Sequence, residues 1–240
     1  MIKHLLRTSH PLERLEQQRK KFLKREDIDP HILSYFKNPL PKTNTKIDDI
    51  SFVIIDFETT GLDPTGDEIL SVGLIALKNQ ILSLSSAEHY YLLTTENIKP
   101  ETAVINHIVP ETLSGGLNKA QFIEKTLSAL KDRVVVAHCS TIEKRFLEKA
   151  LDLPHGVHLP IVWIDTLVLE SSLSSNKHNF LSDYRLCKIR ERKGLPSYLA
   201  HNALADAVAT GELLLVLVQD IFSNKNHTLG DLFVKSKFGK

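Results

Sequence analysis

SerPheValIleIleAspPheGluThrThrGly, residues 51–61, is an apolar run that ends in two acids and a turn. A continuous apolar run of this kind predicts a central strand that is covered on both faces of a sheet. Asp56 and Glu58 lie two residues apart, so a strand places both carboxylates on one face and Phe57 on the other. Such a pair of hard oxygen ligands suits Mg²⁺ or Mn²⁺. The alternative is a helix cap or a solvated strand end, but burying two acids without a cation is costly.

Further strands and helices follow this segment in an order that defines the fold class. Residues 68–77 and 88–93 are strand-like and come after short polar turns, which predicts an antiparallel meander with the first strand. The later elements expected from apolar spacing are a helix at 120–130, a strand at 133–138, a helix at 141–151, the apolar segment 161–167, and helices at about 180–193 and about 202–221. This order predicts a mixed α/β layer fold in which helices flank the sheet.

The chain divides into three parts by composition. Residues 1–47 are rich in lysine and arginine, poor in β-branched residues, and predict short helices. Within them, the prolines and polar residues of 38–46 indicate a linker. We therefore expect a helical basic extension and linker over 1–47, the main domain over 48–222, and a tail over 223–240.

Composition excludes several classes of protein but does not identify a substrate. With 30 lysines and arginines against 29 acids, the net charge of +1 gives no global positive field for nucleic acid. Two cysteines are too few for a disulfide framework, and the N-terminal residues lack the apolar core of a signal peptide, which predicts a cytoplasmic protein. The most apolar late stretch, 213–218, is much shorter than the roughly 20 residues that span a bilayer, so we expect a core helix and no membrane contact.

A second candidate group lies near the end of the chain. HisAsnAlaLeuAlaAspAla, residues 201–207, places His201 just before a predicted helix and Asp206 within its early turns. This separation suits a mobile proton acceptor that lies beside a fixed metal ligand. Taken alone, a histidine cap and an acid that is favourable in the first turn explain the pattern better.

The two candidate segments together resemble a known family. AspPheGluThrThrGly at 56–61 and HisAsnAlaLeuAlaAspAla at 201–207 resemble the first and third motifs of the DEDDh 3′-to-5′ exonucleases, the superfamily of the proofreading ε subunit and RNase T, over roughly residues 51–222. The resemblance implies a ribonuclease H-like fold. It also implies a site in which Asp56, Glu58 and Asp206 bind metal and His201 is the general base, with Glu58 and His201 serving catalysis.

The second motif departs from the family pattern. Where the family has His-Asn-Ala-x-Phe-Asp, residues 138–143 are HisCysSerThrIleGlu, so Glu143 stands in the aspartate position and Ile142 in the aromatic one. The site is therefore a DEEDh variant. A glutamate keeps the charge and adds one methylene, which favours Glu143 as a metal ligand, direct or through water. The alternative is a surface helix acid in a degenerate enzyme.

Substrate contacts are implied by the same resemblance. The residues after the first acidic pair contact the terminal nucleotide in this family, which implies Thr59 and Leu62 here. For Leu62, an apolar turn residue packed in the core is an equal alternative. Residues 104–113 resemble the substrate-loop segment, but Asn106 and His107 stand where the family commonly has His-Gly. His107 is accordingly a candidate substrate-binding residue.

The function implied is metal-dependent hydrolysis with two Mg²⁺ or Mn²⁺ ions per site. It would release nucleoside monophosphates from the 3′ end of a single-stranded nucleic acid, with DNA favoured over RNA. One alternative is a catalytically degenerate nucleic-acid-binding or scaffold module. Another is an exonuclease for RNA or oligoribonucleotides, since phosphate chemistry is indifferent to the 2′-hydroxyl unless a side chain contacts it.

Two outer segments suggest partners. LeuGlyAspLeuPhe at 229–233 partly resembles the sliding-clamp-binding peptide of replication proteins but lacks its leading Gln, so a clamp or polymerase contact competes with an ordinary tail anchor. In the extension, Pro11 and the pair Asp29 and Pro30 mark two helix starts. We expect this segment to pack on the domain or a partner. The alternative is that it extends a nucleic-acid track with Arg19, Lys20, Lys21, Lys24 and Arg25.

Overall fold

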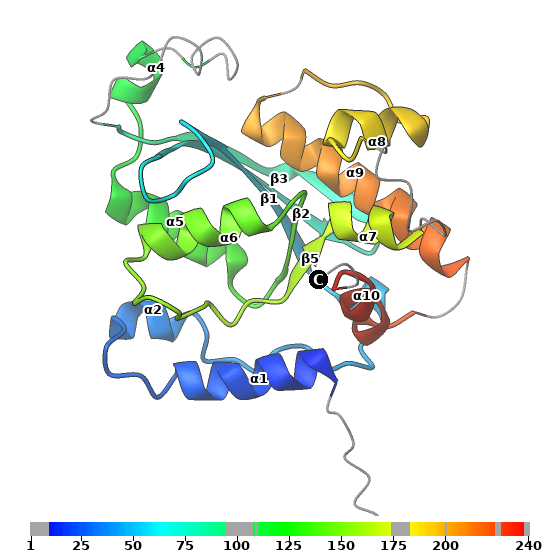
Figure 1. Cartoon of the computed structure of the whole chain (residues 1–240), viewed down its shortest axis with the longest axis horizontal. Helices are drawn as coiled ribbons and strands as arrows, with labels where there is room; N and C mark the ends of the chain where they lie inside the picture. The colour runs from blue at the N-terminus through cyan, green and yellow to red at the C-terminus, as the bar shows by residue number, and fades with distance from the viewer. Residues whose placement is uncertain are drawn as a thin grey trace, which may run out of the picture.

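The structure, a computed structural model, describes residues 10–94, 108, 110–173, 183–199, 201–223 and 227–237. Its centre is one five-stranded sheet of order β3-β2-β1-β4-β5 (Figure 1). Antiparallel pairing joins β1 (Phe52–Thr59), β2 (Ile69–Lys78) and β3 (Ile81–Tyr91), whereas β4 (Val134–Ala137) and β5 (Trp163–Asp165) extend the sheet in parallel from β1. The predicted meander and mixed α/β fold are confirmed.

Helices cover both faces of the sheet, as Figure 1 shows. On one face lie α5 (Lys119–Leu130) and α6 (Thr141–Ala150), and on the other lie α7 (Thr166–Leu173), α8 (Leu186–Arg192) and the long α9 (Ala203–Phe222). A short α4 (Pro110–Ser114) precedes α5. In the part of the chain that the structure describes, no helix is both long and apolar enough to cross a membrane.

The alternation of side chains along β1 divides the core in two. Val53, Ile55 and Phe57 join the cluster under α5 and α6, whereas Phe52 and Ile54 join the cluster under α9. Both clusters are buried, so β1 is the central strand that its continuous apolar run predicted. The next two positions on the α9 side of this strand are Asp56 and Glu58, and the fold therefore directs them toward α9.

The strand β3 begins earlier than the sequence predicted. Asn79 and Gln80 have φ of 50° and 59°, a left-handed pair that makes the tight two-residue hairpin favoured between twisted strands. The chain therefore enters β3 at Ile81, and the prediction of a strand from residue 88 was wrong for its start. The serines within 83–86 hid the strand, because β3 lies at the edge of the sheet and does not need a continuous apolar pattern.

The N-terminal segment forms the predicted helices and packs on the domain. Its helices are α1 (Pro11–Phe22) and α2 (Pro30–Ser34), and Phe22, Ile28 and Ile32 lie in the same core cluster as the α5 and α6 side chains. A short 3₁₀ helix, η1 (Ile47–Asp49), leads into β1.

Among the basic residues of α1, Arg19 has a structural role. It is buried, and its Nη1 donates to the carbonyl oxygens of Phe36 and Lys37 at 2.8 and 3.0 Å. Its inclusion in a nucleic-acid track was therefore wrong. Lys20, Lys21 and Lys24 are exposed.

The tail pairs with the linker that precedes the sheet. The backbone N–H groups of Leu229 and Gly230 donate to the carbonyls of Thr45 and Thr43, at 2.8 and 2.9 Å. The last helix, α10 (Leu229–Lys235), buries Leu232 and Phe233 against the core below α9. Apolar side chains from before residue 47 and after residue 222 pack in the same clusters as the sheet. The division of the chain at these two residues stays a prediction.

A glycine in β2 sets how closely α9 approaches the sheet. Gly73 pairs with Asp56 in register, and a Cβ placed there would lie 2.1 Å from the carbonyl oxygen of Ala203. No side chain fits in that distance, so the first turn of α9 lies directly on the backbone of β2.

We expect Gly73→Ala to lower the free energy of unfolding by about 1–3 kcal/mol, because the helix start has to move off the sheet. Gly115→Ala is the matched control, since nothing lies within 4 Å of a Cβ there. Denaturant titration of the three proteins measures the difference. Equal loss in both variants would show that the close approach at Gly73 has no energetic weight.

Candidate active site

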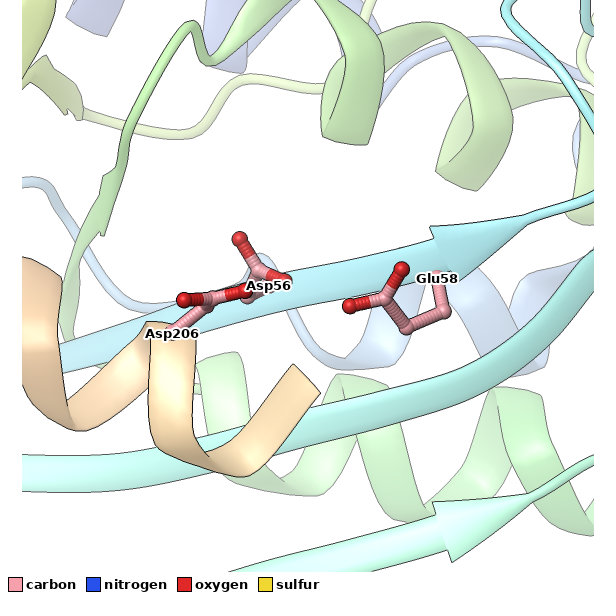
Figure 2. Close-up of side chains that lie close together, drawn as sticks. All are labelled: Asp56, Glu58 and Asp206. Carbon is pink, nitrogen blue, oxygen red and sulfur yellow. The ribbon is translucent and has the colours of Figure 1, made fainter. Parts of the chain in front are cut away.

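Three carboxylates converge between β1 and the start of α9. Asp56 and Glu58 project from β1, and Asp206 projects from the first turns of α9 (Figure 2). One oxygen from each lies within 4.8 Å of the others. The predicted residues from the two ends of the domain are thus brought together, 150 residues apart in the chain. The donors are all hard oxygens, as Mg²⁺ and Mn²⁺ require.

Local structure fixes where α9 begins. Asn202 is its N-cap, and the side-chain Oδ1 accepts a hydrogen bond from the N–H of Ala205 at 3.0 Å. This cap satisfies one of the free amides of the first turn. With the helix start seated at Gly73, the cap places Asp206 over β1.

Burial and mutual repulsion raise the pKa values of the cluster. For Asp56, burial is the largest cause, followed by the charges of Glu143, Asp206 and Glu58, and its pKa is well above the usual value. Burial and Asp206 raise the pKa of Glu58 to about 8, and burial raises that of Asp206. The cluster therefore holds protons where free carboxylates would not, and a cation that replaces those protons would relieve the repulsion. The residues present fit a divalent cation.

Glu143 faces this cluster from the first turn of α6. Its side chain is only 3% exposed, so the alternative of a surface helix acid was wrong. Burial raises its pKa to about 8, with Asp165 adding to the shift and Lys144 opposing it. Its Oε2 is buried without a hydrogen-bond partner. Glu143 lies outside the group of three that share 4.8 Å, yet its charge acts on Asp56. A residue that binds a cation, directly or through water, would have such an unpaired buried oxygen when the cation is absent.

His201 lies in an exposed position beside Asp206. Its backbone is left-handed, with φ of 63°, and its N–H donates to Asp206 Oδ2 at 2.9 Å. The backbone of the predicted base is thus tied to a predicted ligand, while its side chain is on the surface. A left-handed backbone is costly for residues other than glycine and persists where the surrounding structure holds it in place.

The predicted substrate residues have different outcomes. Thr59 ends β1, and its hydroxyl donates to the carbonyl of Gly61 at 2.6 Å. Leu62 is 72% exposed in the loop after β1, so the alternative of a packed turn residue was wrong. His107 lies outside the described residues.

Asp165 supports the site and was not predicted. At the end of β5, its carboxylate accepts hydrogen bonds from the N–H groups of Cys139, Ser140 and Leu167 at 3.1, 2.8 and 3.1 Å, and from the Ser140 hydroxyl at 2.9 Å. These bonds fix the turn from β4 into α6, and so the direction of Glu143. The available signal was an acid that ends the apolar segment 161–164, the pattern already used for β1.

Comparison with known proteins places the chain in a family. The family model for the RNase T type of exonuclease matches residues 53–214, more than half of the chain. The chain belongs to this exonuclease family. Relatives include a PolC-type DNA polymerase III of Thermotoga maritima, 33% identical over 171 residues, which are 71% of this chain and 12% of the relative. The 3′-5′ exonuclease DinG of Staphylococcus haemolyticus is 28% identical over 188 residues, which are 78% of this chain and 20% of the relative.

The chain thus spans a fifth or less of the length of these relatives. Among solved structures, a complex of Escherichia coli ExoI with single-stranded DNA has a TM-score of 0.61 at 18% identity, covering 73% of this chain and 42% of that one. Exonuclease X with 5′ overhanging duplex DNA has a TM-score of 0.58 at 19% identity, covering 76% and 99%. At these identities the likeness shows the fold alone. The predicted family and the ribonuclease H-like fold are both confirmed.

The raised pKa of Glu58 predicts how stability depends on pH without metal. The pKa rises from a usual 4.5 to about 8, so the folded protein binds this proton more tightly than the unfolded chain. The bound proton therefore stabilises the folded protein fully below about pH 4.5, and this stabilisation is lost as the pH rises to about 8. In chelator, we expect the free energy of unfolding from denaturant titrations to fall across this window, and to fall less in Glu58→Gln. Glu26→Gln, which changes an exposed acid, should follow the wild type. Parallel curves for all three proteins would contradict the shift.

Proposed function

We propose that the chain is a metal-dependent 3′-to-5′ exonuclease that releases nucleoside monophosphates from single-stranded nucleic acid, preferably DNA. The convergence of Asp56, Glu58 and Asp206 within 4.8 Å carries the proposal. A protein that only binds strands has no use for three crowded carboxylates, because they repel phosphate unless cations neutralise them. The family of the chain supports the same reading.

The four acids are the proposed ligands of two Mg²⁺ or Mn²⁺ ions. Asp56, Glu58 and Asp206 supply the close group, and Glu143 adds an oxygen from α6. When bound, the ions lower the pKa of an attacking water and stabilise charge on the leaving oxygen. The chain contributes rigid placement, since β1 is buried on both faces and α9 is fixed by its cap and by Gly73.

Proton transfer and substrate contact are the remaining proposed roles. We propose that the His201 imidazole accepts the proton of the attacking water, since the backbone bond to Asp206 holds this residue at the site while its side chain stays accessible. Thr59, Leu62 and His107 are the proposed contacts to the 3′-terminal nucleotide. An apolar side chain as exposed as Leu62 offers a surface on which a base can pack.

The DNA preference rests on what the similar proteins are named for. The relatives include DNA polymerases, and two similar structures were solved with single-stranded or overhanging DNA. RNA is the alternative substrate. Rates on DNA and RNA oligomers of matched sequence decide between them, and a faster rate on RNA would reverse the assignment.

Partners other than a nucleic-acid 3′ end are weaker parts of the proposal. Leu229, Leu232 and Phe233 are buried, so the 229–233 peptide cannot dock on a sliding clamp while α10 stays folded. A polymerase contact is supported only by the name of the PolC-type relatives. The cytoplasmic location stays a prediction from sequence.

End-labelled single strands test the function. Purified protein is incubated with 5′-labelled and 3′-labelled oligonucleotides in Mg²⁺, Mn²⁺ or chelator. We expect a metal-dependent ladder from the 5′ label and early release of a labelled mononucleotide from the 3′ label. Binding without hydrolysis in either metal would favour the non-catalytic module.

Substitution of single ligands should separate catalysis from folding. We expect Asp56→Ala and Asp206→Asn to remove detectable hydrolysis and to leave the fold intact in chelator, since each relieves the crowding of charge. His201→Ala should lower the rate by about 10²–10⁴-fold with little change in metal binding. Nuclease assays, circular dichroism and metal titration give the three readouts. Ligand variants within tenfold of wild-type activity would refute the assignment.

Glu143 gives the sharpest test of the variant motif. If it is a ligand, Glu143→Ala should cripple hydrolysis, whereas Glu143→Asp should keep substantial activity and change the ratio of Mg²⁺ to Mn²⁺ rates. Mg²⁺ demands near-octahedral geometry, so displacing a ligand by one methylene affects Mg²⁺ activity most. Rates in both metals are compared for the two variants and the wild type. Full turnover by Glu143→Ala in both metals would make Glu143 a bystander.

A further inference from the structure

The loop between α8 and α9 carries His201, and a buried arginine holds this loop. Arg190 lies in α8, which packs alongside α9 (Figure 1), and it is only 3% exposed. Its Nη1 donates to the carbonyl of Ala209 in α9 at 2.6 Å, and its Nη2 donates to the carbonyl of Pro196 in the loop at 2.8 Å. One guanidinium therefore joins the loop to the helix that carries Asp206.

A loop tyrosine completes the same group. Tyr198 donates its hydroxyl hydrogen to Glu212 Oε1 at 2.8 Å, while Arg190 Nη2 donates to Glu212 Oε2 at 2.8 Å. The guanidinium carbon of Arg190 lies 4.8 Å from the centroid of the Tyr198 ring, within the range of a cation–π contact. Arg190, Tyr198 and Glu212 thus form a closed set of contacts, which we call the loop anchor.

The residues of the loop anchor and their partners lie close in sequence to both His201 and Asp206. Tyr198 is three residues before His201, and Ala209 is three residues after Asp206. Tyr198 and Leu199 are 42% and 69% exposed, so apolar burial does little to hold this part of the loop. The directional contacts of Arg190 and Glu212 are what fix it, because a planar guanidinium makes several hydrogen bonds at set angles.

We propose that Arg190, Tyr198 and Glu212 are positioning residues that hold the His201 loop over the carboxylates. The inference rests on the proposed function. The left-handed backbone of His201 and its N–H bond to Asp206 require the preceding loop to arrive in one direction. A misplacement of about 1 Å at a reacting group can cost about 10²-fold in rate. A loose loop would therefore leave the His201 imidazole present but too poorly positioned to accept the proton.

Kinetics of loop-anchor variants test the proposal in the full chain with saturating Mn²⁺. We expect Tyr198→Ala and Arg190→Lys to lower kcat by about 10- to 100-fold, with KM and metal affinity little changed. Tyr198→Phe keeps the ring over Arg190 and should lose less. Because Arg190 is buried, its variant can lose stability, whereas the partly exposed Tyr198 tests the same contact without that complication.

A matched control comes from Lys193, which follows α8 and makes ion pairs with α7 and α9. Lys193 Nζ lies 2.7 Å from Asp220 Oδ2 and 3.2 Å from Glu170 Oε2, two acids that do not belong to the loop anchor. Lys193→Met should lower the melting temperature and leave kcat unchanged. A loss of kcat in this control equal to that in Tyr198→Ala would reduce the loop anchor to general stability and overturn the proposal.

A double-mutant cycle with His201→Ala gives the decisive readout. If the loop anchor acts through the base, Tyr198→Ala should lower kcat by less than about twofold once His201 is absent. The same loss in both backgrounds, or an effect confined to KM, would overturn the proposal and make Tyr198 a substrate contact. A wild type without metal-dependent hydrolysis overturns the proposed function and the positioning role together. An active wild type with additive losses overturns only the positioning role.

Discussion

Repulsion between crowded carboxylates is the constraint on which this structure depends. One oxygen from each of Asp56, Glu58 and Asp206 lies within 4.8 Å of the others. Burial raises all three pKa values, and the charges of neighbouring acids add to the shift at Asp56 and Glu58. Nothing in the cluster itself favours that arrangement without a cation. The surrounding fold has to supply the free energy, and it does so through the central strand β1, which is packed between two apolar clusters.

The supports differ according to what each residue has to do. The acids project from a strand and two helices, and hydrogen bonds fix the start of each helix: Asn202 caps α9, and Asp165 holds the turn into α6 from 25 residues further along the chain. His201 instead lies on an exposed loop. The N–H of His201 donates to Asp206, and Arg190 holds an earlier part of the same loop. The proposed ligands are thus held rigidly, while the side chain of the proposed base keeps its access to solvent.

Sequence patterns predicted the parts of the site that short-range rules determine. The apolar run of β1, the spacing of Asp56 and Glu58 and the start of α9 follow from periodicity and capping, which operate over a few residues. Asp165 and Arg190 escaped prediction because their partners lie up to 26 and 22 residues away, and only the folded chain brings them together. Arg19 misled for a similar reason. Its place in a run of basic residues predicts an exposed side chain, but it is buried and donates a hydrogen bond to a carbonyl 17 residues away.

Gly73 shows how far the requirements of the proposed site can extend from its carboxylates. It has no side chain, binds no ligand and moves no proton, yet it sits opposite Asp56 with the carbonyl of Ala203 at 2.1 Å from where a Cβ would be. Every other amino acid would lift the helix that carries Asp206. Under natural selection this position should tolerate as little change as the acids themselves, and in a comparison of related sequences an invariant Gly73 would look like a member of the active site although its contribution is purely the space that it leaves empty.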